Sequence, residues 1–391
     1  MPESSVTVVI PNYNGIAYIR DCLDSLLSGT VVPEILVVDN ASADGSREVV
    51  EKEYAGRVTL LSLRSNTGFC HAVNSGIHLA RTPYVMLLNN DTLVTEHCVE
   101  RLLAAISRKE RIFSVQAKLL SYADHHVIDD AGDEYCALGW AFARGSGKPA
   151  EAYDRPSAVF SCCAAAAIYR MSTFEEIGYF DERHYCYLED VDIGWRARIY
   201  GYQNWYEPAA VVYHVGSAAS GSRHNPFKEI CTSGNNRYLL WKNMPAFQRG
   251  LNWPLTALGA AVKRRYFTQK GLGESYDSGY ARGAYLIELA KYEDLMRRYD
   301  SPEKRPLMEE AGLMLDEEEE ESAAATGAAG AAPECPADSG ETGGKQEKPA
   351  KPPIHPLYLG GKVPFRVRHL FNYFRIQFAL WGNLGRRLKQ Q

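Results

Sequence analysis

The sequence predicts an α/β fold with a parallel sheet, because short β-branched runs alternate with amphipathic segments in the first quarter of the chain. This order is typical of a sheet with helices on both faces. The expected strands are residues 5–11, 34–40, 58–63 and 84–90, and the expected helices between them are residues 17–29, 42–56 and 68–80.

The first predicted helix shows the helical pattern clearly. Apolar side chains recur at helical spacing at Ile19, Leu23 and Leu26, and Gly29 can end the helix. The next helix is expected to begin at Ser42, a residue type that caps first turns. The strands on either side are short apolar runs, so we expect them to be buried.

Each predicted strand ends in polar residues. In YVMLLNNDTLVT (residues 84–95), an apolar run stops at two amides and a carboxylate. A turn alone would explain one such group, because Asn and Asp hydrogen-bond their own backbone there. Four groups in succession predict one crevice, because ligands of open α/β sheets bind beyond the carboxyl ends of the strands. The four groups are residues 11–14, 39–40, 64–66 and 89–91.

The rest of the chain divides by composition. Further strands are expected at residues 158–170 and 209–216, and a helix at residues 188–202. The segment before the tail is acidic and then rich in Ala, Gly and Pro, which predicts a disordered linker. The expected parts are a catalytic domain (1–225), a mostly helical C-terminal region (226–315), the linker (316–353) and a basic amphipathic helix (354–391).

The tail predicts a surface-binding helix. Residues 362–391 contain seven Lys or Arg and no acidic residue. Its large apolar side chains fall on one helical stripe, which suits a helix lying on an anionic membrane. The alternative is a helix that docks on its own domain or on a partner. The stripe consists of Val363, Val367, Leu370, Phe371, Phe374, Phe378 and Trp381.

Composition excludes several classes of protein. The net charge of −5 argues against a general nucleic-acid binder. The start has no signal-peptide pattern, and no apolar run approaches the roughly 20 residues of a spanning helix. The nine cysteines form no CxxC pair, so reduced thiols are expected rather than a disulfide framework or a zinc site. The catalytic part is therefore expected in the cytoplasm.

Acidic residues gather at the start of the helix predicted in the second half. Glu189, Asp190 and Asp192 could simply favour the helix macrodipole. One of them could instead act as a general base that deprotonates a hydroxyl nucleophile. Asp192 and Arg196 are spaced for an i,i+4 pair, which leaves Asp190 or Glu189 freer for chemistry.

Two further residues are candidate metal ligands. Asp91 offers a carboxylate oxygen to a divalent cation that could neutralise a diphosphate leaving group. Mg²⁺ and Mn²⁺ both accept carboxylate and phosphate oxygens. His214 ends an apolar run, where it is either a structural residue or a ligand facing the crevice.

Five motifs in order resemble the inverting family 2 glycosyltransferases, in particular their bacterial rhamnosyltransferase-like branch. They are VTVVIPNYNG, ILVVDNASADGS, NTGFCHAVNSGI, LLNNDT and YLEDVDIGWRARIYGY, and the resemblance extends over residues 5–245. It implies a GT-A fold, which is a Rossmann-like nucleotide-diphospho-sugar transferase domain.

The resemblance also implies roles for residues. Asp190 matches the catalytic base, with Glu189 beside it, and Asp91 with His214 matches the metal position. The implied nucleotide-sugar site consists of Pro11, Asn12, Tyr13, Asp39, Arg64, Asn66, Gly68, Asn74, Asn89 and Asn90. The implied acceptor or supporting residues are Asp192, Trp195, Arg196 and Arg223.

The sequence departs from the family pattern in two places. Asn89 stands at the first acidic position of the DxD motif, so one carboxylate is offered to the metal. Arg223 and His224, in a Gly/Ser-rich loop, are candidates to hold the diphosphate instead. Cys162–Cys163 lies where relatives often have Gly, which leaves the acceptor pocket open.

The expected function is metal-dependent, inverting transfer of a sugar to a cell-surface glycan or lipid-linked acceptor. The expected donor is dTDP-rhamnose or a UDP-sugar, the cofactor is Mg²⁺ or Mn²⁺, and the enzyme is expected on the inner face of the cell membrane. One alternative is a nucleotidyltransferase, although PNYNG fits its phosphate loop poorly. The other is a non-catalytic sugar-nucleotide-binding subunit of a membrane assembly.

Overall fold

The computed structural model describes residues 5–216, 221, 224–299 and 362–389. Most of the chain forms one compact unit, Met1–Ala290 with His355–Gln391. A second unit is Lys291–Ile354, of which the last turns of one helix are described. The predicted linker and Arg223 lie outside the described residues.

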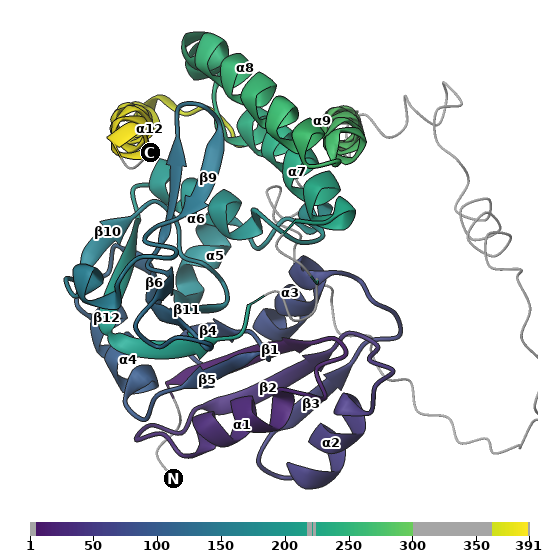
Figure 1. Cartoon of the computed structure of the whole chain (residues 1–391), viewed down its shortest axis with the longest axis vertical. Helices are drawn as coiled ribbons and strands as arrows, with labels where there is room; N and C mark the ends of the chain where they lie inside the picture. The colour runs from purple at the N-terminus through teal and green to yellow at the C-terminus, as the bar shows by residue number, and fades with distance from the viewer. Residues whose placement is uncertain (1–4, 217–220, 222–223, 300–361, 390–391) are drawn as a thin grey trace, which may run out of the picture. The chain divides into compact units, whose positions relative to one another are not determined.

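The predicted α/β class is confirmed, and four parallel strands form one half of the main sheet in the order β4-β1-β2-β3. They are β1 (Val6–Asn12), β2 (Glu34–Asp39), β3 (Thr59–Ser62) and β4 (Tyr84–Leu88). Helices α1 (Ile19–Leu27), α2 (Ser46–Glu53) and α3 (Phe69–Leu79) connect them (Figure 1). All seven elements lie within or next to the predicted ranges, but α2 begins at Ser46 after Gly45, so the expected helix start at Ser42 is wrong.

The other half of the sheet is mixed, which the alternating pattern of the first quarter of the chain does not predict. Strand β11 (Ala166–Arg170) is antiparallel to both β4 and β6 (Ile112–Ser121). Beyond β6 lie β12 (Gln203–His214), parallel to it, and β10 (Ser157–Val159). Two short strands also join, β5 (Thr92–Val94) on β12 and β7 (Ile128–Asp130) on β6.

The apolar run at residues 158–170 is not one strand. It belongs to β10 and β11, which pair with different neighbours, and residues 160–165 pass between them. Hydrophobicity alone cannot show this break, because the connecting residues are also buried. Three of them, Cys163, Ala164 and Ala165, border the main cavity.

Two apolar cores cover the two faces of the sheet. Val8 and Ile10 of β1 face the core that contains α1 and α4 (Cys98–Ser107), whereas Val9 faces the core that contains α3, α5 (Met171–Ile177) and α6 (Glu189–Ile199). Burial on both faces explains why these strands are continuous apolar runs rather than alternating ones.

The C-terminal helices complete the larger unit. They are α7 (Pro226–Asn243), α8 (Ala246–Gln269), α9 (Gly273–Tyr299) and α12 (Leu370–Lys389), and a hairpin of β8 (Asp133–Cys136) and β9 (Trp140–Ala143) stands apart from the main sheet. Three short 3₁₀ turns lie at Ala150–Tyr153, Glu182–His184 and Val367–His369. Among the described helices, none combines the length and the apolar character needed to cross a bilayer.

Candidate active site

A cavity of about 760 Å³ lies where the sequence predicts a crevice. The carboxyl ends of β1, β2 and β4 border it, as do the start of α6 and the end of β12. Its size suits a ligand larger than a simple metabolite. Of the predicted site residues, it is lined by Pro11, Asn12, Tyr13, Asn66, Gly68, Asn89, Asn90, Asp91, Glu189, Asp190 and His214.

Amide side chains hold the edge of the cavity formed by β1 and β4. The Asn12 amide donates to Asp39 Oδ1 (3.0 Å), and its Oδ1 accepts a hydrogen bond from the Asn90 amide (2.8 Å). Asp39 is fully buried and does not border the cavity, so it positions Asn12 from behind. These bonds fix which polar groups of β1 face a ligand.

A second amide pair shapes the neighbouring rim. Asn40 donates to Asn66 Oδ1 (3.0 Å), which also accepts a hydrogen bond from the Gly68 backbone N–H (3.1 Å). Gly68 has φ +86°, and a Cβ there would lie 2.5 Å from the Tyr185 ring. The close approach of Tyr185 therefore requires glycine at this position.

Besides Asp39, two predicted nucleotide-site residues do not border the cavity. Arg64 is exposed and is absent from the cavity wall. Asn74 is buried, and its amide N–H donates to the Phe180 carbonyl oxygen (2.8 Å). Its Oδ1 accepts a hydrogen bond from the Phe180 backbone N–H (3.1 Å). In this structure Asn74 fixes the loop before α6 to α3.

The candidate metal ligands do lie together, and a third residue joins them. His214 Nε2 is 3.4 Å from Asp91 Oδ1, and His214 Nδ1 is 2.7 Å from Asp129 Oδ2. Strand β5 fixes this geometry by pairing Thr92 with His214. Burial opposes the charged imidazole, but the hydrogen bonds that its ring donates to Asp129 and Asp91 raise the pKa of His214 to about 10.

Asp190 is the second residue of α6 and faces the cavity. It is held in place by the Val191 backbone N–H, which donates to Asp190 Oδ1 at 2.7 Å. Burial raises the pKa of Asp190 to about 6. A carboxylate with this pKa is still ionised at neutral pH, yet is a stronger base than an ordinary aspartate.

The turn before Asp190 is strained and held by one side chain. Tyr185, Tyr187 and Leu188 all have φ between +63° and +70°, where residues with a Cβ rarely lie. The buried Asn235 amide of α7 donates to the carbonyl oxygens of His184, Cys186 and Tyr187 at 2.8–2.9 Å. These bonds hold the strained turn and thereby position the start of α6.

Glu189 lies beside Asp190 and is nearly fully buried at the cavity wall. Its Oε2 has no hydrogen-bond partner among the described residues. Burial and the Asp190 charge raise the pKa of Glu189 well above its usual range, which favours the protonated form of the side chain. A neutral carboxyl here can donate a hydrogen bond to a ligand.

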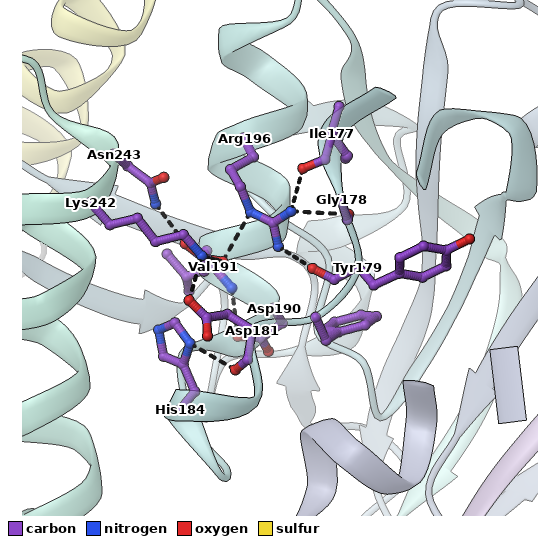
Figure 2. Close-up of polar contacts among 12 residues, drawn as sticks. Ile177, Gly178, Tyr179, Asp181, His184, Asp190, Val191, Arg196, Lys242 and Asn243 are labelled. Atoms are coloured by element: carbon purple, nitrogen blue, oxygen red, sulfur yellow. Dashed lines mark hydrogen bonds and ion pairs between the residues drawn. The ribbon is translucent and has the colours of Figure 1, made fainter. Parts of the chain in front are cut away.

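The predicted supporting residues Asp192 and Arg196 belong to α6 itself and do not border the cavity, and Figure 2 shows Arg196 directed at the backbone of Ile177, Gly178 and Tyr179. Lys242 Nζ donates to Asp181 Oδ2 (2.7 Å) and Asp192 Oδ2 (2.8 Å), and Asn243 donates to Asp192 Oδ1 (2.8 Å). Arg196 forms the predicted pair with Asp192 (3.0 Å) and donates to backbone carbonyls of residues 177–179. Burial alone would raise the pKa of Asp192, but Lys242 and Arg196 lower it well below its usual range.

Trp195 packs in the core, with its ring 5.0 Å from the Tyr135 ring and 5.2 Å from the Phe160 ring. It therefore supports α6 and does not touch the cavity.

Asp181, His184 and Asp192 also form a group whose side-chain ligand atoms lie within 4.8 Å of one another. Such a group could hold a metal ion on geometry alone. The Lys242 ammonium already stands between the two carboxylates and supplies the positive charge. We therefore assign this group to the structural support of α6.

Sequence reasoning missed two acidic residues of the cavity wall, Asp129 and Asp133. Burial and the Asp190 charge raise the pKa of Asp133 well above its usual range. The run DDAGDE, acidic residues around a glycine in a stretch taken for loops, is the signal that could have found them.

Residues 7–178 match the model of "Glycosyl transferase family 2", so the chain carries a domain of this family. A curated relative is the N-acetylglucosaminyl-diphospho-decaprenol L-rhamnosyltransferase of Mycobacterium tuberculosis, 28% identical over 258 residues, which are 59% of this chain and 82% of the relative. Another is the poly-β-1,6-N-acetyl-D-glucosamine synthase of Staphylococcus aureus, 25% identical over 211 residues, which are 53% of this chain and 49% of that enzyme.

Solved glycosyltransferase structures are similar at low identity. GalNAc-T7 with UDP, GalNAc and Mn²⁺ gives a TM-score of 0.49 at 17% identity, over 60% of this chain and 48% of that one. Staphylococcus aureus TarS with UDP-GlcNAc gives 0.45 at 17% identity, over 67% of this chain and 72% of that one.

Proposed function

We propose that this family 2 glycosyltransferase moves a sugar from a nucleotide-diphosphate donor to an acceptor hydroxyl with inversion, and that Asp190 is the general base. The observation that carries the proposal is the position of Asp190. Its carboxylate faces a cavity bordered by the predicted donor residues, and burial raises its pKa toward neutrality.

The mechanism is a single displacement. Asp190 takes the proton of the acceptor hydroxyl, and that oxygen attacks the anomeric carbon of the donor. The bond from the anomeric carbon to the diphosphate oxygen breaks, and the nucleoside diphosphate leaves with the bonding electron pair. Protonated Glu189 is placed to donate a hydrogen bond to the acceptor and hold it beside the base.

A divalent cation fits the residues at the end of β12. Asp91 and His214 offer a carboxylate and an imidazole, which are suitable ligands for Mn²⁺ or Mg²⁺, and Asp129 on the other ring nitrogen of His214 would hold the imidazole in place. When bound, the cation would neutralise charge on the diphosphate leaving group. His214 must lose its second ring proton to act as a ligand, so the metal competes with a proton there.

The donor and acceptor are proposed from the relatives. The mycobacterial relative is named for rhamnose transfer to a lipid-linked diphosphate sugar. We therefore propose dTDP-rhamnose or a UDP-sugar as donor, a lipid-linked or glycan acceptor, and action on the inner face of the cell membrane. The same cavity is lined by the predicted donor residues Pro11, Asn12 and Tyr13 and by Asp133 and Glu189, which supports binding of donor and acceptor in one site.

The test separates transfer from donor binding. Asp190→Asn should lower the transfer rate by at least about a thousandfold, while the affinity for the nucleoside diphosphate measured by calorimetry stays unchanged. Asp21→Asn, an exposed carboxylate on α1, is the matched control and should behave as the wild type. Wild-type transfer also excludes the alternative of a non-catalytic sugar-nucleotide-binding subunit. Retained transfer by Asp190→Asn would remove Asp190 from the role of base.

A further inference from the structure

Helix α12 has two apolar faces, and the structure buries one of them. Tyr373, Ile376 and Leu380 are almost fully buried, and α12 packs against β8 and α6. Polar bonds fix the same face, since Asn383 donates to Tyr135 O (2.8 Å) and Gln377 forms a reciprocal amide pair with Asn252 of α8 (2.8 and 2.9 Å). The tail helix therefore docks on its own domain, which is one of the two alternatives that the sequence left open. Figure 1 shows α12 in yellow beside the hairpin of β8 and β9.

The opposite face of α12 is exposed and aromatic. We define the aromatic face as Phe371, Phe374, Phe378 and Trp381, which follow one another at helical spacing. Phe371 is 71% exposed and Phe378 is 68% exposed. The ring of Phe365 extends this surface toward Phe247 of α8, with 6.0 Å between the ring centres, and both rings are also exposed. Exposed aromatic rings gathered on one stripe are a feature of interaction surfaces.

The charged residues of α12 and α8, the two helices that carry this surface, are all basic. Residues 362–391 contain no Asp or Glu, and α8 also has none between Ala246 and Gln269. Arg375 flanks the stripe and, with Arg198 of α6, lines a cavity of about 120 Å³. Among the described residues that line this cavity, none is acidic. Burial and the Arg375 charge lower the pKa of Arg198 to about 10, so the Arg198 guanidinium is still charged at neutral pH.

We propose that the aromatic face of α12 docks the enzyme on an anionic lipid bilayer, with the cavity between Arg198 and Arg375 taking a lipid phosphate. This inference rests on the proposed function, because transfer to a lipid-linked acceptor brings the enzyme to a bilayer. The residues that support the inference lie on the protein surface and take no part in the transfer chemistry.

The residues of this face match what a bilayer surface requires. Aromatic rings lie at the boundary between headgroups and acyl chains, and long basic side chains reach from the apolar plane to the phosphates. A protein partner would need acidic residues opposite the arginines, and a second copy of this helix would oppose arginine to arginine. Charge complementarity therefore favours an anionic lipid surface.

The experiment is co-sedimentation of the full chain with vesicles of neutral phosphatidylcholine, with and without added phosphatidylglycerol. We expect binding only to the anionic vesicles, and weaker binding at high salt. The double variant Phe371→Ser with Phe378→Ser should lose binding at least about tenfold. Arg375→Gln should weaken it about fivefold. The matched controls are Tyr285→Ser with Tyr292→Ser, which are equally exposed aromatic residues on α9.

Transfer to a water-soluble acceptor keeps the two proposals apart. The aromatic-face variant should retain this activity while losing vesicle binding, and Asp190→Asn should show the reverse. If the Phe371→Ser, Phe378→Ser variant binds anionic vesicles as well as the wild type does, the docking proposal is wrong. It is also wrong if the wild type forms dimers in solution that this variant abolishes, since the face would then pair two copies. If inorganic phosphate binds the cavity at Arg375 but the wild type binds no vesicles, the cavity takes a free anion and the docking proposal is wrong.

Discussion

Two groups in this protein place a histidine with two aspartates, and their surroundings give them opposite roles. Asp91, Asp129 and His214 lie at the cavity wall, where the two carboxylates contact opposite ring nitrogens of the histidine. Asp192 of α6 lies with Asp181 and His184 away from the cavity, where Lys242 pairs with both carboxylates and Arg196 pairs with Asp192. Similar residues therefore make a candidate ligand site in one place and a structural support in the other.

The same contrast separates two neighbouring residues of α6. Asp190 and Asp192 are two positions apart, yet burial without a cation raises the pKa of Asp190, whereas Lys242 and Arg196 lower that of Asp192 despite burial. A carboxylate with a raised pKa is suited to accept a proton. One with a lowered pKa stays ionised and holds its partners.

The largest effect should follow from breaking the buried group. Lys242→Met leaves Asp181 and Asp192 without their shared cation, which should lower the free energy of unfolding by about 3–5 kcal/mol. Denaturant unfolding followed by circular dichroism measures this. Unchanged stability would mean that the group is not the support of α6.

The two aspartates should also differ in how they couple stability to pH. The lowered pKa of Asp192 means that its contribution to stability is present above the unfolded-state value of 3.8 and is lost as pH falls below it. The raised pKa of Asp190 has the opposite sign, since the folded state binds that proton more tightly. Asp192→Asn should therefore lower the melting temperature at pH 7, and Asp190→Asn should leave it equal or higher.

The next effect concerns metal binding at the cavity group. His214→Ala should weaken Mn²⁺ binding by about 10–100-fold in calorimetry, because it removes a ligand and the residue that orients Asp91 and Asp129. His97→Ala is the control, since His97 forms an exposed pair with Glu100 (3.2 Å) away from the cavity. Equal Mn²⁺ affinity in the wild type and His214→Ala would place the metal elsewhere.

A smaller effect is expected at Glu189. Glu189→Ala should raise the KM for the acceptor by about tenfold, the value of a lost hydrogen bond to a ligand, and leave the KM for the donor unchanged. Glu189→Gln retains an N–H donor and should restore most of the affinity. Equal losses in both variants would instead indicate that Glu189 acts as an ionised carboxylate.

The smallest effect should come from an exposed ion pair. Arg264 of α8 and Asp277 of α9 form two hydrogen bonds of 2.8 Å, but both side chains are largely in solvent. Arg264→Ala should leave the melting temperature unchanged, because solvent screens such pairs. A marked fall in the melting temperature of Arg264→Ala would show that burial of the ion pair is not what makes the Lys242 group more stabilising.

Local patterns predicted the parallel half of the sheet and the strand ends that border the cavity. Asp190, Asp91 and His214 were found because each lies at the end of a predictable element. Asp129 and Asp133 were not, because they lie on the short strands β7 and β8, in a stretch where the sequence predicts only loops. Asp39 and Asn74 carry the right chemistry but support the site from behind, which only tertiary packing shows. Of the predicted stripe, the four aromatic residues lie exposed on α12, whereas Val363 is buried before the helix begins, and the second, buried face needed the structure.

The most direct test of the central claim is the pH dependence of kcat/KM for sugar transfer. If Asp190 is the base, the rate should fall about tenfold per pH unit below an apparent pKa of about 6 and be level above it. The residual activity of Asp190→Asn should lack this limb. A flat wild-type profile from about pH 5 to about pH 8, or the same limb in Asp190→Asn, would contradict the assignment.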